Sequence, residues 1–445
     1  MQPNSFNTII ILLINFCMLL YALWLNRKLY KSYCYISLHF LFNLFFFFFY
    51  ICTHTYIILS GNIQTYYKNI VDTSYISSAA IFVTFLNVFF NLGYTINLFF
   101  PKTKQGIIFN KYIKKINVDE LFRIGLTLFI IGMVSKLIYF CVLGGGNILT
   151  YLTTYFAIQL ERVSEHGGAT FEIYLNFLFI LLDVGTDLLL IYTLKTKQHK
   201  NITFLCMGLA VLLYFNTRFG IIKLLFQYII IVCLYLKKIR ERIPVLFLGI
   251  FIPIIFTIIV GLGIYRDITN NKVISNIDYG YFFMGQFHPM MAIADGMAFK
   301  NQFGGYRYGK AIILPIIQKP IPRSVWKNKE LNAGAIYTKT MKPGDLERGF
   351  AVAPGIAFDA YLNFGYVGAL IFFMLLGVLI FKVQSFLYRN IKQLKDNNTL
   401  YVILTAIFGS TLLTLRGADF SNIPLYIIYY IPILIIIFSN IKIRV

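Results

Sequence analysis

Five arginines stand where their side chains could bind a phosphate or diphosphate group. Arginine suits this chemistry because its planar guanidinium group donates paired hydrogen bonds to phosphate oxygens and stays charged at physiological pH. Four of them lie at an end of an apolar segment or in a short loop that joins two apolar segments, on the side that we predict to face outward. The fifth lies in a long polar connection. Each could instead anchor a helix at a lipid surface or pair with a neighbouring acid. The five are Arg162, Arg218, Arg266, Arg348 and Arg323.

Two further side chains could act as a general base. His288 stands in GQFHPMM and is the only histidine of the long connection, so its ring could accept a proton or donate to a phosphate. Asp359, in FDAYLNFG, lies at the end of this connection and could deprotonate or orient a hydroxyl group. The alternatives are a structural histidine beside a proline, and a helix-capping or salt-bridging aspartate.

Aromatic side chains in the same connection could pack against the apolar faces of sugar rings. Trp326 and Tyr337 are the main candidates, with Tyr306 and Tyr308 earlier in the same segment. Tyr and Trp also gather at membrane interfaces without any ligand, so a belt of interfacial aromatics is the alternative.

A second group of charges stands inside apolar segments. Lys136, Asp183, Asp187 and Lys223 would each be costly at membrane depth unless they are paired or hydrated. They could form a proton or ion relay. A structural Lys–Asp pair between neighbouring helices would give the same pattern, so the sequence leaves both interpretations open.

No pattern for a nucleotide, a metal or another cofactor is present. The run Gly144-Gly145-Gly146 lacks the strand, turn and helix that a phosphate-binding loop requires. The six cysteines lie in or beside apolar runs without paired short spacings, and we interpret them as small hydrophobic residues. We therefore expect no metal and no cofactor, and an energy source other than ATP.

The composition places these residues in a membrane protein. Of the 445 residues, 58% are hydrophobic and only 13% are charged, and the mean hydropathy is +0.71. A soluble domain carries about 25% charged residues, so the composition excludes a soluble enzyme and a disordered chain. The net charge of +22 is accounted for mainly by loops that stay in the cytoplasm, and nucleic acid is not an expected partner.

Apolar windows predict an all-α, polytopic integral membrane protein with about 11 transmembrane helices, because about 20 apolar residues cross the hydrocarbon core. Residues 1–264 would hold the first eight helices, residues 265–359 a long loop with short helices, and residues 360–445 the last three. The windows are 6–25, 36–60, 76–100, 121–142, 171–194, 202–217, 219–236, 244–264, 360–381, 399–415 and 422–440.

Basic residues predict the orientation of these helices. With the amino terminus outside, alternate loops hold 22 of the 40 Lys and Arg residues, whereas the short opposite loops hold only Lys68, Arg162, Arg218 and Arg416. This asymmetry puts the carboxyl terminus in the cytoplasm and the long loop outside. Between Tyr265 and Asp359 that loop has twelve basic residues against six acids. Since long translocated loops are exempt from the charge rule, we expect an anionic ligand there; a solvated or headgroup-facing loop is the alternative.

The long loop resembles the outer loop of bacterial O-antigen and oligosaccharide repeat-unit polymerases of the Wzy type. The resemblance rests on PIPRSVWKNKE at 320–330 and GFAVAPGIAFDAYLNFGYVGAL at 349–370, and is strongest over roughly 265–380. In that family a Pro-Arg, a Trp and a Lys precede an acid and an Asn-Phe-Gly, with glutamate expected where this chain has Asp359. The positions that match this pattern are Pro322, Arg323, Trp326, Lys327 or Lys329, Asp359, Asn363, Phe364 and Gly365. The spacing from Arg323 to Gly334 also resembles an Arg-to-Gly spacing of such loops. Arg162 and Arg218 stand at positions where the family places arginine.

The resemblance implies an enzyme that joins glycan repeat units carried on undecaprenyl diphosphate, at the outer face of the cytoplasmic membrane. One lipid-linked oligosaccharide would be the donor and another the acceptor, and membrane lipid would surround both. Arginines would stabilise the lipid diphosphate as it leaves, and Asp359 or His288 would assist the attacking hydroxyl. A chain-length regulator and a flippase are expected partners, and no metal is implied.

Two other functions remain open from the sequence. An O-antigen ligase would transfer glycan from the same donor to lipid A core. A flippase or secondary transporter would use Lys136, Asp183, Asp187 and Lys223 as a coupling path, although no internal repeat relates two halves of the chain.

Overall fold

The structure is a computed structural model in which every described regular element is a helix. It describes residues 3–60, 73–99, 116–143, 170–214, 218–236, 289–318, 321, 326, 328–347, 352, 354–393, 398–412 and 422–438. These ranges contain no strand, which confirms the predicted all-α fold. The backbone groups of a helix are hydrogen-bonded within the helix itself, as a chain inside lipid requires.

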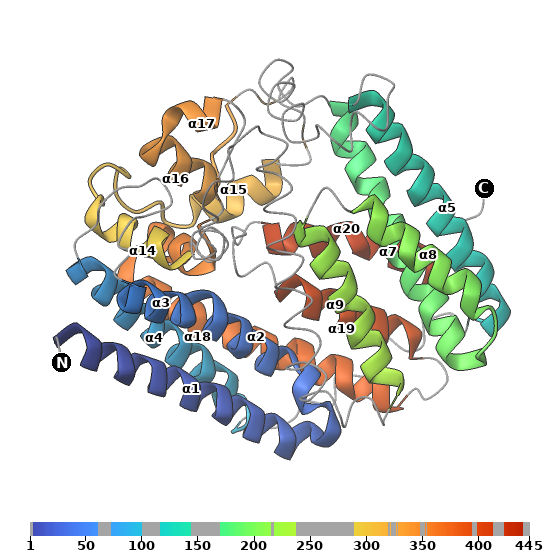
Figure 1. The fold of residues 1–445 in the computed structure, drawn as a ribbon, viewed down its shortest axis with the longest axis horizontal. Coiled ribbons are helices and arrows are strands. Elements are labelled where there is room, and N and C mark those ends of the chain that lie inside the picture. Colours follow the sequence, from blue (N-terminus) through green and yellow to red (C-terminus); the bar gives the residue numbers. More distant parts are fainter. Residues whose placement is uncertain are drawn as a thin grey trace. The chain divides into compact units, whose positions relative to one another are not determined.

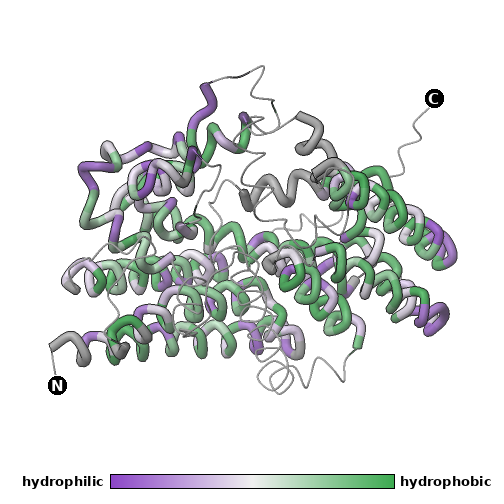
Figure 2. The backbone as a smooth tube through the Cα atoms, turned by 45° about the horizontal axis from the view of Figure 1, so that its top comes forward, coloured by the Kyte–Doolittle hydropathy of each residue, from purple (hydrophilic) through white to green (hydrophobic). Residues whose placement is uncertain are grey.

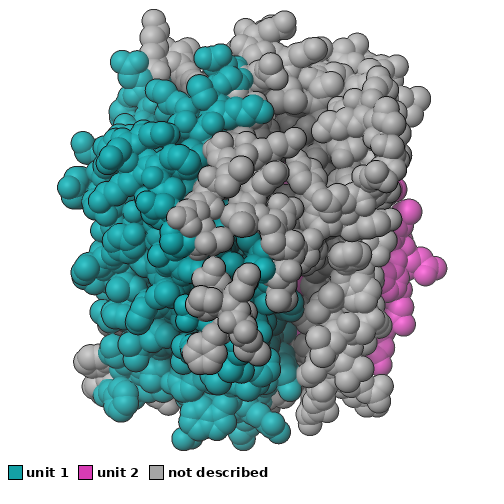
Figure 3. Space-filling view, turned by 60° about the vertical axis from the view of Figure 1, so that its left-hand side comes forward, with its two compact units in different colours: residues 1–101, 277–384, 411–425 teal, residues 102–276, 385–410, 426–445 magenta. Residues whose placement is uncertain are grey.

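The chain forms two compact units, each built from segments that are distant in the sequence (Figure 1). Unit 1 comprises residues 1–101, 277–384 and 411–425, and unit 2 comprises residues 102–276, 385–410 and 426–445 (Figure 3). The sequence predicts three consecutive parts: eight helices, a long loop and three more helices. Each compact unit combines segments from several of these parts, so the units do not test this division and it stays a prediction.

Unit 1 holds the first helices and all of the described part of the long loop. Helix α1 packs against α2 and α4, and it is hydrophobic over most of its length (Figure 2). The elements are α1 (Pro3–Tyr30), η1 (Lys31–Ile36), α2 (Leu38–Phe46), the π-helical η2 (Phe47–Cys52), α3 (Thr53–Ser60), α4 (Thr73–Ile96), α14 (Pro289–Ala298), α15 (Lys310–Gln318), α16 (Ala333–Met341), α17 (Pro343–Glu347) and most of α18 (Ile356–Gln393).

Glycines allow α4 and α18 to approach until their backbones touch. A Cβ atom on Gly93 would lie 1.9 Å from the carbonyl oxygen of Met374, and one on Gly377 would lie 2.1 Å from that of Phe90. Small residues at such crossings are typical of membrane helices, where close van der Waals packing replaces the hydrophobic effect. This contact packs the part of α18 that follows Gly365 against α4.

Buried amide side chains add a polar network inside unit 1. The Gln384 amide donates to Asn26 Oδ1 at 2.9 Å and to the Tyr94 hydroxyl at 3.0 Å, and its oxygen accepts the His39 backbone N–H at 2.9 Å. The His39 ring hydrogen-bonds Asn91 Oδ1 at 2.8 Å. Each polar group here gains a partner inside the protein, which removes the cost of exposing it to lipid.

Unit 2 contains helices from the middle and the end of the chain. Helices α5 and α7 have the most extensive contact, because Gly132 and Gly185 bring them together: a Cβ on Gly132 would lie 2.4 Å from the Leu182 backbone nitrogen. The elements are α5 (Val118–Leu143), α7 (Thr170–Thr196), α8 (Lys200–Leu213), α9 (Arg218–Tyr235) and most of α19 (Thr399–Thr411) and α20 (Asn422–Phe438), with the end of α18.

Ten of the eleven predicted windows coincide with described helices, and the window 244–264 lies outside the described residues. Within the described part of the chain, five helical stretches are long and apolar enough to cross a membrane. The total of about 11 spans and the loop topology therefore stay predictions. The five stretches are Asn7–Tyr30, Leu38–Thr55, Ser74–Ile96, Val118–Cys141 and Ile356–Lys392.

Helix α18 differs from its predicted window in two respects. It begins at Ile356, before the predicted start at residue 360, so Asp359 lies in its first turn. It is also broken at Gly365, whose φ of 67° and ψ of −164° are not helical. A hydropathy window cannot detect such a break, because the apolar residues continue on both sides of it.

Candidate functional site in the long loop of unit 1

The structure describes three of the nine predicted site residues with their side chains, and all three lie in unit 1. Asp359 is in α18, Tyr337 is in α16 and Trp326 lies between α15 and α16. Arg218 begins α9, but its side chain is not described. The predicted residues outside the described ranges are His288, Arg323, Arg162, Arg266 and Arg348.

Asp359 is fully buried at the start of α18. The Asn363 side-chain amide donates to Asp359 Oδ1 at 2.8 Å and to the Asp359 backbone oxygen at 2.9 Å. One turn of helix separates the two residues, so this pair forms within α18. The contacts show that Asp359 helps to build the helix start, while its predicted part in chemistry stays a prediction.

Backbone carbonyl groups of α18 just before the break at Gly365 accept hydrogen bonds from the long loop. The backbone N–H groups of Arg307 and Tyr308 donate to the carbonyls of Leu362 and Asn363 at 3.0 and 2.7 Å. The Ala311 N–H, in the first turn of α15, donates to Asn363 Oδ1 at 3.2 Å. Asn363 therefore joins Asp359, the loop and α15 through its side chain and backbone.

Aromatic rings surround this junction. The Tyr306 ring lies so close to Gly365 that a Cβ there would meet the ring carbon Cζ at 2.8 Å. Tyr306 contacts Tyr361 edge to face, and Tyr361 contacts Tyr366 in a similar way. Among nearby aromatic residues, Tyr308 is 81% exposed and could meet a ligand directly.

Tyr337 and Trp326 have different environments. Tyr337 is fully buried, and its ring packs against those of Phe303 and Phe358. Trp326 is 38% exposed. Both residues stay predicted sugar contacts, and only Trp326 presents a substantial surface in the described conformation.

A buried carboxyl that is not among the predicted site residues lies beside Tyr337. Asp295, in α14, is fully buried, and its Oδ2 accepts a hydrogen bond of 2.5 Å from the Tyr337 hydroxyl. Its Oδ1 has no hydrogen-bond partner among the described residues. Burial raises the pKa of Asp295 to about 7, and the Tyr337 hydrogen bond partly opposes this rise. A carboxyl with this pKa can take up or release a proton near neutral pH.

The local sequence explains how Asp295 is placed. Helix α14 packs against α4 and η2, so that nearly all of its side chains are buried. Helix α16 starts at an N-cap, where Asn332 Oδ1 accepts the Ala335 N–H at 2.9 Å, and this orients Tyr337. The only sequence signal for Asp295 is an acid within the apolar run PMMAIADGMA.

The intramembrane charges form a separate cluster within unit 2. Asp183 accepts hydrogen bonds from the hydroxyls of Tyr214 at 2.7 Å and Tyr430 at 2.6 Å. Lys223 donates to the Tyr430 hydroxyl at 3.4 Å, so a tyrosine bridges this lysine and this aspartate. The side-chain nitrogen of Lys136 lies 4.1 Å from the centre of the Phe179 ring, a cation–π contact.

Asp187, one turn after Asp183, completes the cluster. It accepts a hydrogen bond from the Gln227 side-chain amide, while its Oδ1 has no hydrogen-bond partner among the described residues. Tyrosine and glutamine side chains thus link these charges within unit 2, and both the ion relay and the structural Lys–Asp pair stay predictions. Neither this network nor any other described part contains three His, Cys, Asp or Glu side chains grouped as metal ligands.

A family model described as O-antigen polysaccharide polymerase Wzy matches residues 3–444. The chain belongs to the Wzy family. The match covers both units and confirms the resemblance noted in the long loop. No curated protein and no solved structure matches the chain. Its family and its long apolar helices make the chain a multi-pass membrane protein. Its family also gives it the role of an O-antigen polymerase, which has a glycosyltransferase-like activity in polysaccharide biosynthesis. Wzy membership also implies lipid-linked oligosaccharide substrates.

Proposed function

We propose that this chain joins oligosaccharide repeat units carried on undecaprenyl diphosphate into an O-antigen or a related surface polysaccharide. The family match over residues 3–444 is the observation that carries the proposal. The reaction would take place at the outer face of the cytoplasmic (inner) membrane, with the long loop on that face and the carboxyl terminus in the cytoplasm. The distribution of basic residues along the sequence supports this orientation.

The reaction needs a stabilised leaving group. A hydroxyl of the acceptor glycan attacks the first sugar of the donor, the sugar–phosphate bond breaks, and the bonding electrons leave with the lipid diphosphate. Preorganised positive groups would stabilise this charge, an effect that is often the largest in catalysis. We assign this role to Arg323 and the diphosphate-binding arginines Arg162, Arg218, Arg266 and Arg348.

The reaction also needs an acceptor for the hydroxyl proton. Asp359 and His288 are the candidates from the sequence, and Asp295 joins them because its pKa of about 7 suits a base that works near neutral pH. Asp295 is fully buried in the described conformation, so contact with an acceptor hydroxyl would require part of the surrounding protein to move. Trp326 and Tyr337 would hold sugar rings.

Three experimental outcomes distinguish the proposed polymerase from the alternative ligase and transporter. Purified protein in proteoliposomes receives a lipid-linked repeat unit together with lipid A core as a second acceptor. A polymerase yields a ladder of longer lipid-linked glycans, whereas a ligase yields lipid A core carrying one glycan. A flippase or secondary transporter moves the lipid-linked unit across the bilayer without lengthening it. A chain-length regulator and a flippase would be separate partner proteins, and adding the regulator would narrow the ladder.

A further inference from the structure

The segment between Asp295 and Glu330 has an unusual charge distribution. Its 34 residues include seven basic residues and no acid. Elsewhere in the long loop the acids nearly balance the bases, with six acids against five bases. The excess positive charge of the loop is therefore concentrated in this segment, which contains α15. The seven are Lys300, Arg307, Lys310, Lys319, Arg323, Lys327 and Lys329.

Helix α15 in this segment has an apolar face that the protein does not cover. Ala311 and Ile312 are buried, whereas Ile313 and Ile317, one turn apart, are 57% and 55% exposed. Large exposed aliphatic side chains on one face of a helix are typical of helices that lie in a membrane interface. Lys310 is exposed at the start of the same helix.

The position of α15 relative to α18 gives the level of the membrane surface. The N–H groups of Tyr308 and Ala311 donate to Asn363, two residues before the break at Gly365. Directly after the break, α18 presents a row of exposed apolar side chains along one face. The row consists of Val367 at 70%, Ile371 at 49%, Leu375 at 58% and Leu379 at 52% exposure.

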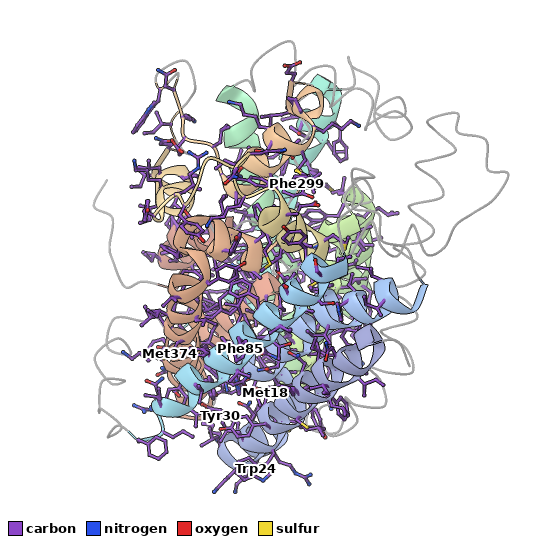
Figure 4. The ribbon with its side chains drawn as sticks, turned by 90° about the vertical axis from the view of Figure 1, so that its left-hand side faces the viewer. Met18, Trp24, Tyr30, Phe85, Phe299 and Met374 are labelled. Carbon is purple, nitrogen blue, oxygen red and sulfur yellow. The ribbon has the colours of Figure 1, made fainter. Side chains whose placement is uncertain are left out.

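This row has the spacing of a lipid-facing helix stripe, which indicates that the lipid-exposed part of α18 begins near Gly365. Helix α15 is attached at that boundary. Trp24 and Tyr30 lie near the end of α1 that is predicted to face the cytoplasm. Phe299, in the same segment as α15, lies at the opposite end of unit 1 (Figure 4), which agrees with a place for α15 at the outer membrane surface. Two aromatic residues that flank α15, Tyr308 and Trp326, are the types that anchor proteins at this level.

We propose that α15 is an interfacial helix that binds the anionic phospholipids of the membrane leaflet facing the long loop. Ile313 and Ile317 enter the boundary between headgroups and acyl chains, Trp326 lies among the headgroups, and Lys310 contacts a lipid phosphate, while the positive charge of the whole segment attracts the anionic surface. The charge decides between lipid and a second copy of the chain as the occupant. Two copies of a segment with seven bases and no acid would repel each other, whereas an anionic lipid surface attracts it.

The two tryptophans of the chain allow a direct test. Trp24→Phe leaves Trp326 as the only tryptophan, and Trp326→Phe leaves Trp24 as the control. The full chain is reconstituted into vesicles of phosphatidylcholine with or without phosphatidylglycerol, and either lipid carries bromine near the carbonyl end of its acyl chains. We expect brominated phosphatidylglycerol to quench Trp326 about two-fold more than brominated phosphatidylcholine at the same mole fraction.

Variants of α15 separate the apolar and the charged contributions. Ile313→Ser with Ile317→Ser should lower the quenching of Trp326 by both brominated lipids. Lys310→Gln should lower only the preference for phosphatidylglycerol, whereas Lys339→Gln, an exposed lysine of α16, should keep it. Quenching of Trp24 by the bulk lipid in the matching Trp326→Phe proteins shows that each variant is inserted.

Three results would overturn the proposal. One is quenching of Trp326 by aqueous iodide but not by brominated lipid, which would place the segment in water. Another is equal quenching by both lipids, which would remove the anionic preference. A third is quenching that disappears when the vesicles hold too few protein copies to associate, which would indicate a second copy as the occupant. None of these readouts depends on glycan transfer.

Discussion

The hydroxyl of Tyr337 donates to one carboxylate oxygen of Asp295, and the other oxygen of Asp295 has no hydrogen-bond partner among the described residues. This contact joins α16 to α14 inside a fully buried environment. Burial raises the pKa of Asp295 to about 7, and the hydrogen bond from Tyr337 partly opposes this rise. The stability of this part of unit 1 should therefore depend on pH.

The first prediction concerns the direction of that dependence. The folded protein binds the Asp295 proton more tightly than the unfolded chain, so the free energy of unfolding falls as pH rises from 3.8 to about 7. The fall is at most about 1.4 kcal/mol per pH unit. Asp295→Asn should remove this component, as measured by thermal unfolding in detergent across the pH range. Glu347→Gln, at an exposed carboxyl of α17, should keep it, and an unchanged profile in Asp295→Asn would contradict the assignment.

The second prediction separates Tyr337 from Asp295. Tyr337→Phe removes the hydrogen bond that partly lowers the Asp295 pKa, so the pH at which stability stops falling should move above that of the parent protein. Tyr308→Phe, at a residue that is 81% exposed, is the control and should leave the profile in place. A shift to lower pH in Tyr337→Phe would show that the hydroxyl does not stabilise the charged form.

The third prediction tests the break in α18. Gly365→Ala places a side chain at a φ of 67° and against the Tyr306 ring, so it should destabilise the protein by about 1–2 kcal/mol or more. The matched control is Gly208→Ala in α8, where a Cβ meets no atom within 4 Å and alanine is the better helix former. Thermal unfolding of both variants decides the point, and equal stabilities would argue for a continuous helix at Gly365.

The fourth prediction concerns the buried amides of unit 1. Gln384→Leu removes three hydrogen bonds and leaves the buried groups of Asn26 and His39 with fewer partners. We expect a loss of about 1–3 kcal/mol per group left unsatisfied. Gln302→Leu, at an exposed loop position, should cause little change. A fully stable Gln384→Leu protein would mean that the network adds nothing to stability.

Hydropathy was sufficient to locate most helices in the sequence. Nearly every window of apolar residues coincides with a described helix, because a segment in lipid must satisfy its backbone groups internally. The same reasoning could not find the break at Gly365 or the contact between Gly93 and Met374, since both depend on what packs against the glycine. The buried amides around Gln384 were missed for a similar reason: single polar residues in apolar windows have no periodic pattern.

Titratable residues of the site were predicted less well. Lys136, Asp183, Asp187 and Lys223 were recognised because charges within apolar windows are costly, but the link through Tyr430 needs the tertiary structure. Asp295 was not recognised because an acid in a loop is ordinarily exposed. Its burial follows from the packing of α14 on α4 and η2, which no local pattern indicates.

The central claim is that this chain polymerises lipid-linked repeat units, and the lengths of the glycans made by purified protein test it most directly. The protein receives only a lipid-linked repeat unit in proteoliposomes, with no nucleotide, and the products are separated by size. We predict a ladder that Arg323→Ala abolishes and Lys339→Ala preserves. If purified, inserted wild-type protein leaves every repeat unit at its starting length, the proposed function is contradicted. A normal ladder from Arg323→Ala would contradict the assignment of Arg323 alone.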